Sequence, residues 1–346
     1  MVMTIPSSLQ QEPLQVYLVG SLPLSSSTEV FQRLATTFPN RLLRMPDGET
    51  GKRYYFTRWQ RDIFEKAPFV LSSRGQSITK TKELDAPISL KPLEYDDFAL
   101  ASYADFCKLR GQGVISPGIR FQVCLPTPIN VIISHIDPKY QVEVEVLYTR
   151  ALMAALRRIQ DNIPKEDLAI QWDAAVEFAL IEGIEHPFFS KSWFSPLKQG
   201  LEERFARLTA SVDECVEMGF HLCYGDIGHK HFVEPKDAGH LVEMANVISS
   251  LTSRNVNWIH MPVPKDRTDD AYYAPLKELK LRKETKVYLG LAHPWDLDGT
   301  QKRIKAARKV LDNFGIASEC GMGRTPNDEF DAIIEVLVTA SKGFEA

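Results

Sequence analysis

Three short, almost continuously apolar runs begin 30 residues apart in the C-terminal part of the chain: VNWIHMPV (256–263), KVYLGLAH (286–293) and IASECGM (316–322). The segments between them have apolar residues every three to four positions, which is typical of amphipathic helices. Strands with nearly continuous apolar content are typical of a parallel sheet that is covered on both faces. This stretch therefore predicts repeated strand–helix units.

The same alternation extends towards the N-terminus. Five further apolar runs, at residues 16–21, 42–49, 120–127, 168–175 and 220–226, bring the total to eight. Eight strands, each followed by a helix, are the pattern of a (β/α)8 or TIM barrel. A doubly wound sheet is the competing fold, but the first run continues as VGSLPLSSS and lacks the glycine-rich fingerprint of that fold. We therefore predict an α/β fold, the (β/α)8 TIM barrel.

The chain length fits one enlarged barrel. The sequence has 346 residues, whereas a typical barrel has about 250. Most of the surplus lies between the second and third runs, at residues 50–118, which are polar, aromatic-rich and irregular. We predict that residues 1–346 form a single barrel in which residues 50–118 are an insertion after strand 2. We expect this insertion to lie over the C-terminal mouth of the barrel.

Composition narrows the class of protein. The chain is 44% hydrophobic and 25% charged, as in ordinary globular proteins, and its net charge of −4 gives no basic field for nucleic acid. No apolar run approaches the ~18 residues that span a bilayer, and residues 1–14, which include no Lys or Arg and no long apolar core, are not expected to be a secretory signal. Five scattered cysteines do not suggest a disulfide framework. We expect a cytoplasmic protein with a small-molecule substrate and no nucleic-acid or membrane partner; the sequence does not indicate its oligomeric state.

Reactive residues collect at the predicted strand ends, where a barrel builds its active site. In FHLCYGD, His221 and Cys223 are two residues apart and so face the same side of a strand. Cys320 lies at the same level of the last strand. Buried cysteine is often only a small apolar residue, but one imidazole and two thiolates from neighbouring strands suit Zn²⁺. We predict a zinc site made by His221, Cys223 and Cys320.

Two further histidines also lie at the ends of predicted strands, and others lie in a loop. His260 ends the run at 256–263 and is a candidate for the fourth zinc ligand, for substrate binding, or for a hydrogen-bonded core histidine. His293 ends the run at 286–293, where a neutral imidazole can act as a general acid or base, or anchor the loop. His229 and His231, in the loop after the fifth run, are expected to be solvated, or alternatively to support a metal ligand from outside the coordination shell.

The fourth run supplies polar groups for substrate binding. Gln171 and Asp173 share one face of this strand, and Asp173 lies near its end. We expect Asp173 to bind a substrate ammonium group, or alternatively to pair with a barrel cation such as Arg44. Gln171 is a further substrate-binding candidate.

Two loops add candidates for the same role. The loop RMPDGETGKR after the second run places Arg44, Asp47 and Glu49 around two glycines, which fits either polar ligand recognition or ordinary loop fixing. In GSLP after the first run, Gly20 and Ser21 offer backbone N–H groups and a hydroxyl that can hold a carboxylate.

Six segments, in chain order, resemble the family of cobalamin-independent methionine synthase and uroporphyrinogen decarboxylase, and most of all the C-terminal catalytic barrel of the methionine synthase. VGSLP resembles the family's G-S-F-P, CLPTPIN its T-G-P-V-T, and QWDAAVE its Q-I-D-E-P-A. HLCY resembles the zinc motif H-x-C-Y, YLGLAHP the D-I-H-S-P segment, and SECGMGR the closing C-G-L.

The resemblance implies roles for these residues. The H-x-C-Y and C-G-L segments would bind zinc, Asp173 would bind the substrate amine, and Ser21 with its backbone would hold an amino-acid thiol. His293 would be the proton donor. The family's remaining zinc ligand is a glutamate, and the matching position here holds His260.

The residues and the resemblance together predict a zinc-dependent methyl or alkyl transferase that activates a thiol, or a related small polar metabolite, at the barrel mouth. The alternative is a metal-independent lyase, decarboxylase or cyclase on the same fold. In that alternative the three histidines at the strand ends perform acid–base chemistry, while Asp173 and Arg44 orient carboxylates. The sequence does not predict the substrate or the alkyl donor.

Overall fold

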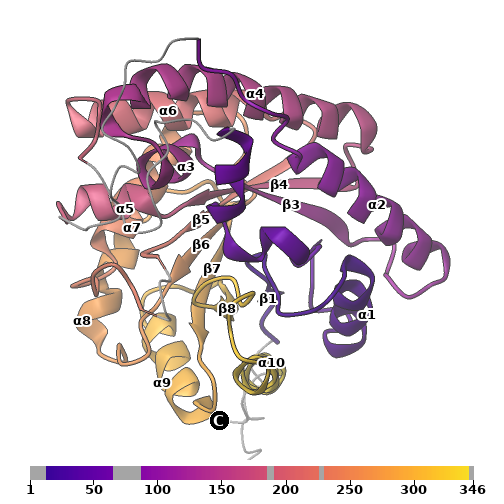
Figure 1. Ribbon diagram of the computed structural model, residues 1–346. Coiled ribbons are helices and arrows are strands. Elements are labelled where there is room, and N and C mark those ends of the chain that lie inside the picture. The colour runs from indigo at the N-terminus through magenta and orange to yellow at the C-terminus, as the bar shows by residue number, and fades with distance from the viewer. Residues whose placement is uncertain (1–12, 65–86, 185–190, 226–229, 343–346) are drawn as a thin grey trace, which may run out of the picture.

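The computed structural model describes residues 13–64, 87–184, 191–225 and 230–342. Eight parallel strands form one sheet in the order β1-β8-β7-β6-β5-β4-β3-β2. Backbone hydrogen bonds from Val16 N to Arg41 O (3.0 Å) and from Leu22 N to Gly48 O (2.9 Å) join the two outer strands. The sheet is therefore a nearly closed (β/α)8 barrel, which confirms the predicted fold (Figure 1). The strands are β1 (Val16–Tyr17), β2 (Arg44–Pro46), β3 (Arg120–Pro126), β4 (Leu168–Ala174), β5 (Glu217–Leu222), β6 (Trp258–Pro262), β7 (Lys286–Ala292) and β8 (Gly315–Ser318).

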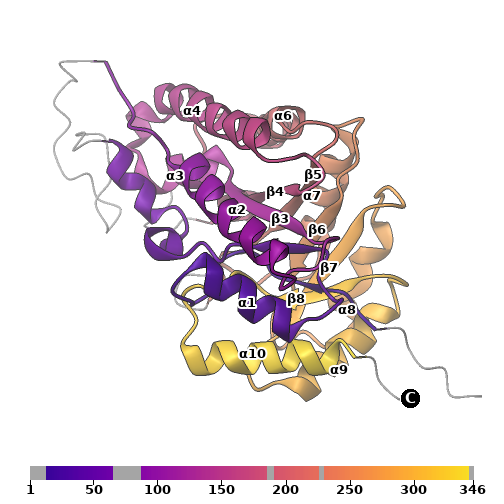
Figure 2. The ribbon, with the colours of Figure 1, turned by 90° about the vertical axis from the view of Figure 1, so that its right-hand side faces the viewer.

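Helices surround the strands. In the turned view, α4 and α6 lie along one side of the strands and α9 and α10 along the other (Figure 2). No helix in the described ranges is both long enough and apolar enough to cross a membrane. The α-helices are α1 (Ser27–Thr37), α2 (Tyr95–Gly111), α3 (Pro128–His135), α4 (Gln141–Asn162), α5 (Val176–Ile181), α6 (Leu197–Ser211), α7 (Gly239–Ser250), α8 (Asp270–Tyr273), α9 (Leu297–Arg308) and α10 (Asn327–Ala340). Short 3₁₀ helices are η1 (Gly51–Tyr55), η2 (Arg58–Phe64), η3 (Pro138–Tyr140) and η4 (Ala274–Glu278).

The long chain segment between β2 and β3 contains one helix of the outer helical ring, α2, and further structure that does not belong to that ring. Helix α2 packs between α1 and α4, which is the place of the second helix of a barrel. The extra chain therefore lies before α2, where η1 and η2 are described and residues 65–86 lie outside the described residues. That residues 50–118 act as an insertion over the mouth stays a prediction.

Side chains fill the barrel interior near the starts of the strands. The rings of Tyr17 and Tyr288 stack with centroids 4.8 Å apart, and the Trp258 indole donates a hydrogen bond to the Tyr17 hydroxyl at 2.9 Å. Gly219 leaves the room for this indole, because a Cβ at that position would lie 2.1 Å from it. The reactive groups are consequently confined to the other end of the barrel. The side chains that fill the interior near the strand starts are Tyr17, Val19, Ala169, Trp258, Tyr288 and Ala317.

Candidate metal centre and substrate cavities

His221, Cys223 and Cys320 come together at the C-terminal ends of β5 and β8. Their ligand atoms all lie within 4.8 Å of one another. The Sγ atoms of Cys223 and Cys320 are 3.6 Å apart, and Nε2 of His221 is 3.7 Å from Sγ of Cys320. Cys223 follows the last residue of β5, yet its N–H still donates to Ala174 O at 2.8 Å. The sheet ladder therefore fixes two of the three residues directly.

These distances fit a tetrahedral zinc site. Zinc bonds of about 2.3 Å to sulfur and 2.0–2.1 Å to nitrogen place two sulfur ligands about 3.8 Å apart and a sulfur and a nitrogen about 3.6 Å apart. The observed separations of 3.6 and 3.7 Å lie close to these values. Nitrogen and sulfur are also the ligand atoms that zinc prefers. The three residues therefore fit the metal that the sequence predicts.

His260 lies beside His221, as its partner on the neighbouring strand, and orients it. Nε2 of His260 is 3.1 Å from the carbonyl oxygen of Ser318, and its Nδ1 is 2.7 Å from Nδ1 of His221. A carbonyl only accepts, so Nε2 of His260 carries the proton, and burial lowers the pKa of His260 to about 3, which keeps the ring neutral. Its bare Nδ1 accepts the proton of His221 Nδ1. Nε2 of His221 is thereby left unprotonated towards the thiols.

Both ring nitrogens of His260 are thus used by the protein. His260 is fully buried and is not part of the cluster of potential ligand atoms. This geometry does not fit the expectation that His260 is a fourth ligand or contacts substrate. It fits the third reading, a hydrogen-bonded core histidine, here one that holds a ligand's tautomer.

Asp173, at the end of β4, faces the same cavity as the thiols. Gln171 lies two residues before Asp173 on β4, and its side-chain amide donates a hydrogen bond to Asp173 Oδ1 at 2.7 Å. Gln171 does not line the cavity, so it supports the carboxylate from the barrel interior. Burial, and then the charge of Glu49, raise the pKa of Asp173 well above its usual value. The two carboxyl groups therefore sit close enough to repel each other.

The loop after β2 holds Glu49 in place. Asp47 accepts two hydrogen bonds from Arg53, at 2.8 and 3.3 Å, and one from the backbone N–H of Glu49 at 2.9 Å. Gly48 has a φ of +80°, which allows the tight turn. Burial raises the pKa of Glu49 to about 7, although the charge of Arg53 opposes the rise. Asp47 is thus a loop-fixing residue, and Glu49 is the one that lines the cavity.

Gly20 and Ser21 form another part of the wall. The Ser21 hydroxyl accepts a hydrogen bond from Gly323 N at 3.2 Å, and Ser21 O accepts one from Met322 N at 2.7 Å. A Cβ at Gly20 would lie 2.5 Å from Oε1 of Glu49. The absence of a side chain at Gly20 therefore lets Glu49 approach the cavity floor.

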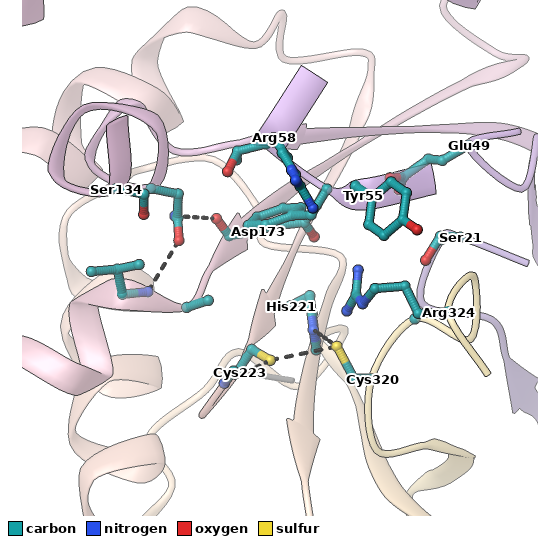
Figure 3. Close-up of a pocket in the computed structure, with 18 of the residues that line it drawn as sticks. Ser21, Glu49, Tyr55, Arg58, Ser134, Asp173, His221, Cys223, Cys320 and Arg324 are labelled. Atoms are coloured by element: carbon teal, nitrogen blue, oxygen red, sulfur yellow. Dashed lines mark hydrogen bonds between the residues drawn. The ribbon is translucent and has the colours of Figure 1, made fainter. Parts of the chain in front are cut away.

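These groups share a cavity of about 410 Å³, which we call the first cavity. Figure 3 shows the two thiols and His221 at one end, with Asp173, Glu49 and Ser21 facing the space between them and Arg58. Its charged or titratable lining residues in the described chain are Glu49, Tyr55, Arg58, Arg61, His135, Asp173, His221, Cys223, Cys320 and Arg324.

His293 faces a different space, the second cavity, of about 520 Å³. Cys320 and Gly321 line both cavities, so the candidate metal centre, which lies in the first cavity, reaches the second through Cys320. His293 is buried, and its Nε2 is 3.0 Å from Val263 O, while its Nδ1 is 3.8 Å from Oε2 of Glu319. Burial lowers the pKa of His293, and the charge of Glu319 opposes this.

His231 lies in the second cavity as well, contrary to the expectation of a solvated loop residue. Its side chain is only 7% exposed, and its Nε2 is 2.9 Å from Oε1 of Glu319. Sequence reasoning missed this contact because the two residues are on separate loops. The clustering of histidines in the GHKHF segment is the only local signal. His229 lies outside the described residues.

Arg44 lies at the opposite end of the barrel. It is the first residue of β2, its guanidinium is 4.0 Å from the ring centroid of Trp258, and it is 2.6 Å from Oε2 of Glu217 at the start of β5. This position does not fit the expected roles of Arg44 in substrate binding or in pairing with Asp173. Arg324, which sequence reasoning did not single out, is a second cation near Glu49, and its charge lowers the pKa of Glu49 less than that of Arg53 does.

Fold and site together define a (β/α)8 barrel with a His–Cys–Cys centre in the first of two cavities at its mouth. The fold is similar to that of a candidate vitamin-B12-independent methionine synthase from Listeria monocytogenes (15% identity, TM-score 0.56, 96% of this chain and 98% of that chain). It is also similar to that of a B12-independent methionine synthase from Shewanella sp. W3-18-1 in complex with selenomethionine (14% identity, TM-score 0.56, 96% and 97%). These likenesses confirm the resemblance at the level of the fold. Comparisons with protein-family profiles and with curated proteins found no match.

Proposed function

We propose that this protein is a zinc-dependent methyl or alkyl transferase that activates a thiol. The observation that carries the proposal is the convergence of His221, Cys223 and Cys320 on the wall of the first cavity, with ligand atoms within 4.8 Å. Three protein ligands leave a fourth position open, as in catalytic zinc sites. Zinc held there would supply the positive charge that lowers the pKa of a substrate thiol.

The chain's own residues fit the rest of an amino-acid thiol. Asp173 and Glu49 face the first cavity and, when ionised, attract an ammonium group. An ammonium between them also relieves their mutual repulsion. The backbone at Gly20 and Ser21 lines the same cavity, and we assign the carboxylate to it. The selenomethionine complex of the Shewanella protein supports this substrate class, because selenomethionine carries the same ammonium and carboxylate groups.

The second cavity suits the alkyl donor, because it meets the first at Cys320. In the transfer, the substrate sulfur forms a bond to the alkyl carbon. The bond between that carbon and the donor breaks, and its electron pair goes to the leaving group. We assign to His293, which lines this cavity, the transfer of a proton to that leaving group. Its Nε2 proton is committed to Val263 O, so His293 would first take up a proton at Nδ1, which faces Glu319 at 3.8 Å, and then give it to the leaving group.

Metal analysis tests the proposal. Protein purified without added zinc should contain about one equivalent of zinc, and Cys223→Ser should contain less than about a tenth. Cys215→Ser, which changes an exposed cysteine outside the site, is the matched control and should retain its metal. A wild-type content below about a tenth of an equivalent, unchanged by Cys223→Ser, would contradict the proposal.

Fewer residues of the structure support the metal-independent alternative. His221 and His260 hydrogen-bond to each other, and Arg44 lies at the far end of the barrel. Only the group formed by His293, Glu319 and His231 favours it. Under this alternative, turnover would survive removal of the metal by a chelator and would still require His293.

A further inference from the structure

The first cavity extends beyond the metal centre to η2 and the end of α3. Tyr55, Arg58 and Arg61 line it from one side, and Ser134 and His135 line it from α3. In Figure 3 the Arg58 guanidinium and the thiols lie at opposite ends of the drawn site. This part of the cavity has no role in holding the sulfur, ammonium or first carboxylate of the substrate.

The charges at this end are positive. The only carboxyl groups among the described lining residues are Glu49 and Asp173, which belong to the β2 loop and the end of β4. Arg58 is exposed, its guanidinium lies 5.5 Å from the Tyr55 ring centroid, and it makes no ion pair with any residue of the described chain. An arginine fork without a carboxylate partner matches an incoming carboxylate or phosphate.

The pKa of His135 is affected by burial and by the positive charges of Arg61 and Arg58. Nε2 of His135 lies 3.1 Å from Thr57 O and 3.2 Å from the Thr57 hydroxyl, so the ring is fixed against the residue that precedes η2. Burial first, and then the charges of Arg61 and Arg58, lower the pKa of His135 to about 4. Both guanidinium groups therefore lie near this neutral imidazole.

The size of the cavity also indicates a substrate larger than a small amino-acid thiol. Its volume of about 410 Å³ falls within the range of about 300–1,000 Å³ that holds drug-sized ligands. A small amino-acid thiol held at Asp173 and the thiols would leave the end at η2 unfilled.

We infer that Arg58 and Arg61 form an anion subsite, so that the substrate is an amino-acid thiol with a second oxyanion, a carboxylate or a phosphate, remote from its sulfur. This inference rests on the proposed thiol transferase for the identity of the substrate. The subsite itself depends only on the two arginines and the cavity.

Binding of two related thiols tests the inference. L-cysteinylglycine carries one carboxylate and L-cysteinyl-L-glutamate carries two, and both keep a free ammonium group beside the thiol. Calorimetry of the wild-type protein should give a Kd at least tenfold lower for cysteinylglutamate. The double variant Arg58→Gln/Arg61→Gln should remove this preference and leave the Kd for cysteinylglycine within twofold. Arg158→Gln, which removes an exposed charge on α4, is the matched control and should keep the preference.

Competition identifies the oxyanion. Displacement of cysteinylglutamate by glutarate at lower concentration than by inorganic phosphate assigns a carboxylate, and the reverse order assigns a phosphate. Equal affinity of the wild type for the two thiols, or a preference that persists in a folded double variant, overturns the inference. Thermal melting establishes that the double variant is folded.

The metal-poor Cys223→Ser variant separates this inference from the proposed function. Glutarate or phosphate should still bind to it, and the Arg58→Gln/Arg61→Gln changes should abolish that binding. If zinc is absent from the wild type but this anion binding persists, the transferase proposal fails and the subsite stands. If zinc and cysteinylglycine bind without any anion preference, the subsite fails and the transferase proposal stands.

Discussion

The Nδ1 atoms of His221 and His260 lie 2.7 Å apart in the interior of the barrel. His260 accepts the His221 proton because its own proton is committed to the Ser318 carbonyl, 3.1 Å away. The cluster of His221, Cys223 and Cys320 thus presents an imidazole nitrogen that is ready to bind a cation before one arrives. Such outer partners commonly contribute ten- to a hundredfold to metal affinity.

Replacement of His260 should therefore weaken zinc binding without removing a ligand. For His260→Ala we expect a loss of roughly 10- to 100-fold in zinc affinity, measured by competition with a chromophoric chelator. The stoichiometry at saturating zinc should stay at one equivalent. His240→Ala, which changes a half-exposed histidine on α7, is the control. An unchanged affinity in His260→Ala would show that the hydrogen bond does not prepare His221.

Binding of an amino acid should depend on pH through Glu49. Its pKa of about 7 means that Glu49 is mostly neutral at pH 6 and mostly ionised at pH 8. An ammonium group is attracted only by the ionised form, so the affinity for L-methionine should rise about tenfold between pH 6 and 8. L-methionine is a suitable probe because it has no thiol that titrates in this range.

The variant Glu49→Gln isolates this effect. It should bind L-methionine more weakly at pH 8 and show little change between pH 6 and 8 when Kd is measured by calorimetry. If the variant kept the full pH dependence, another group would be responsible. Asp173→Asn should weaken binding at both pH values.

Much of the fold follows from the sequence because local patterns determine it. All eight strands lie at or near the predicted apolar runs, and β5 begins at Glu217, three residues before the predicted run at 220–226. The cluster of His221, Cys223 and Cys320 was also predictable, since barrel topology brings strand ends together.

The rest of the site depends on details that local patterns do not contain. Arg44 belongs to β2 itself and not to the loop after it, and this shift along the strand moves it to the other end of the barrel. Whether His260 is a ligand or a ligand's partner depends on ring orientation. The contact between His231 and Glu319 joins loops that follow different strands.

That contact gives a further prediction. Burial alone would lower the pKa of His231, but the hydrogen bonds and charges of Glu319 and then of Glu234 raise it to about 9. His231 should therefore remain protonated at pH 7.5, as NMR titration of its ring protons can show. In Glu319→Gln the pKa should fall, while Glu234, 3.1 Å from Nδ1 of His231, keeps part of the rise.

The same pair should make stability depend on pH. Because the folded-state pKa of His231 lies above the unfolded value of about 6.5, its contribution is complete below pH 6.5 and is lost as the pH rises to about 9. The free energy of unfolding in urea should decline over this window in the wild type and decline less in Glu319→Gln. Parallel curves for the two proteins would exclude the linkage.

The packing of side chains in the barrel interior near the strand starts requires a glycine at position 219. A Cβ there would lie 2.1 Å from the Trp258 indole, which cannot move freely because it donates to Tyr17 at 2.9 Å and packs against Arg44 at 4.0 Å. Gly219→Ala should lower the free energy of unfolding by about 1–3 kcal/mol, as overpacked cores do. Gly111→Ala, at a position where a Cβ meets nothing within 4 Å, is the control and should be neutral or slightly stabilising. Equal urea midpoints for the two variants would mean that the indole has room to shift, and that the interior is less tightly packed than these distances indicate.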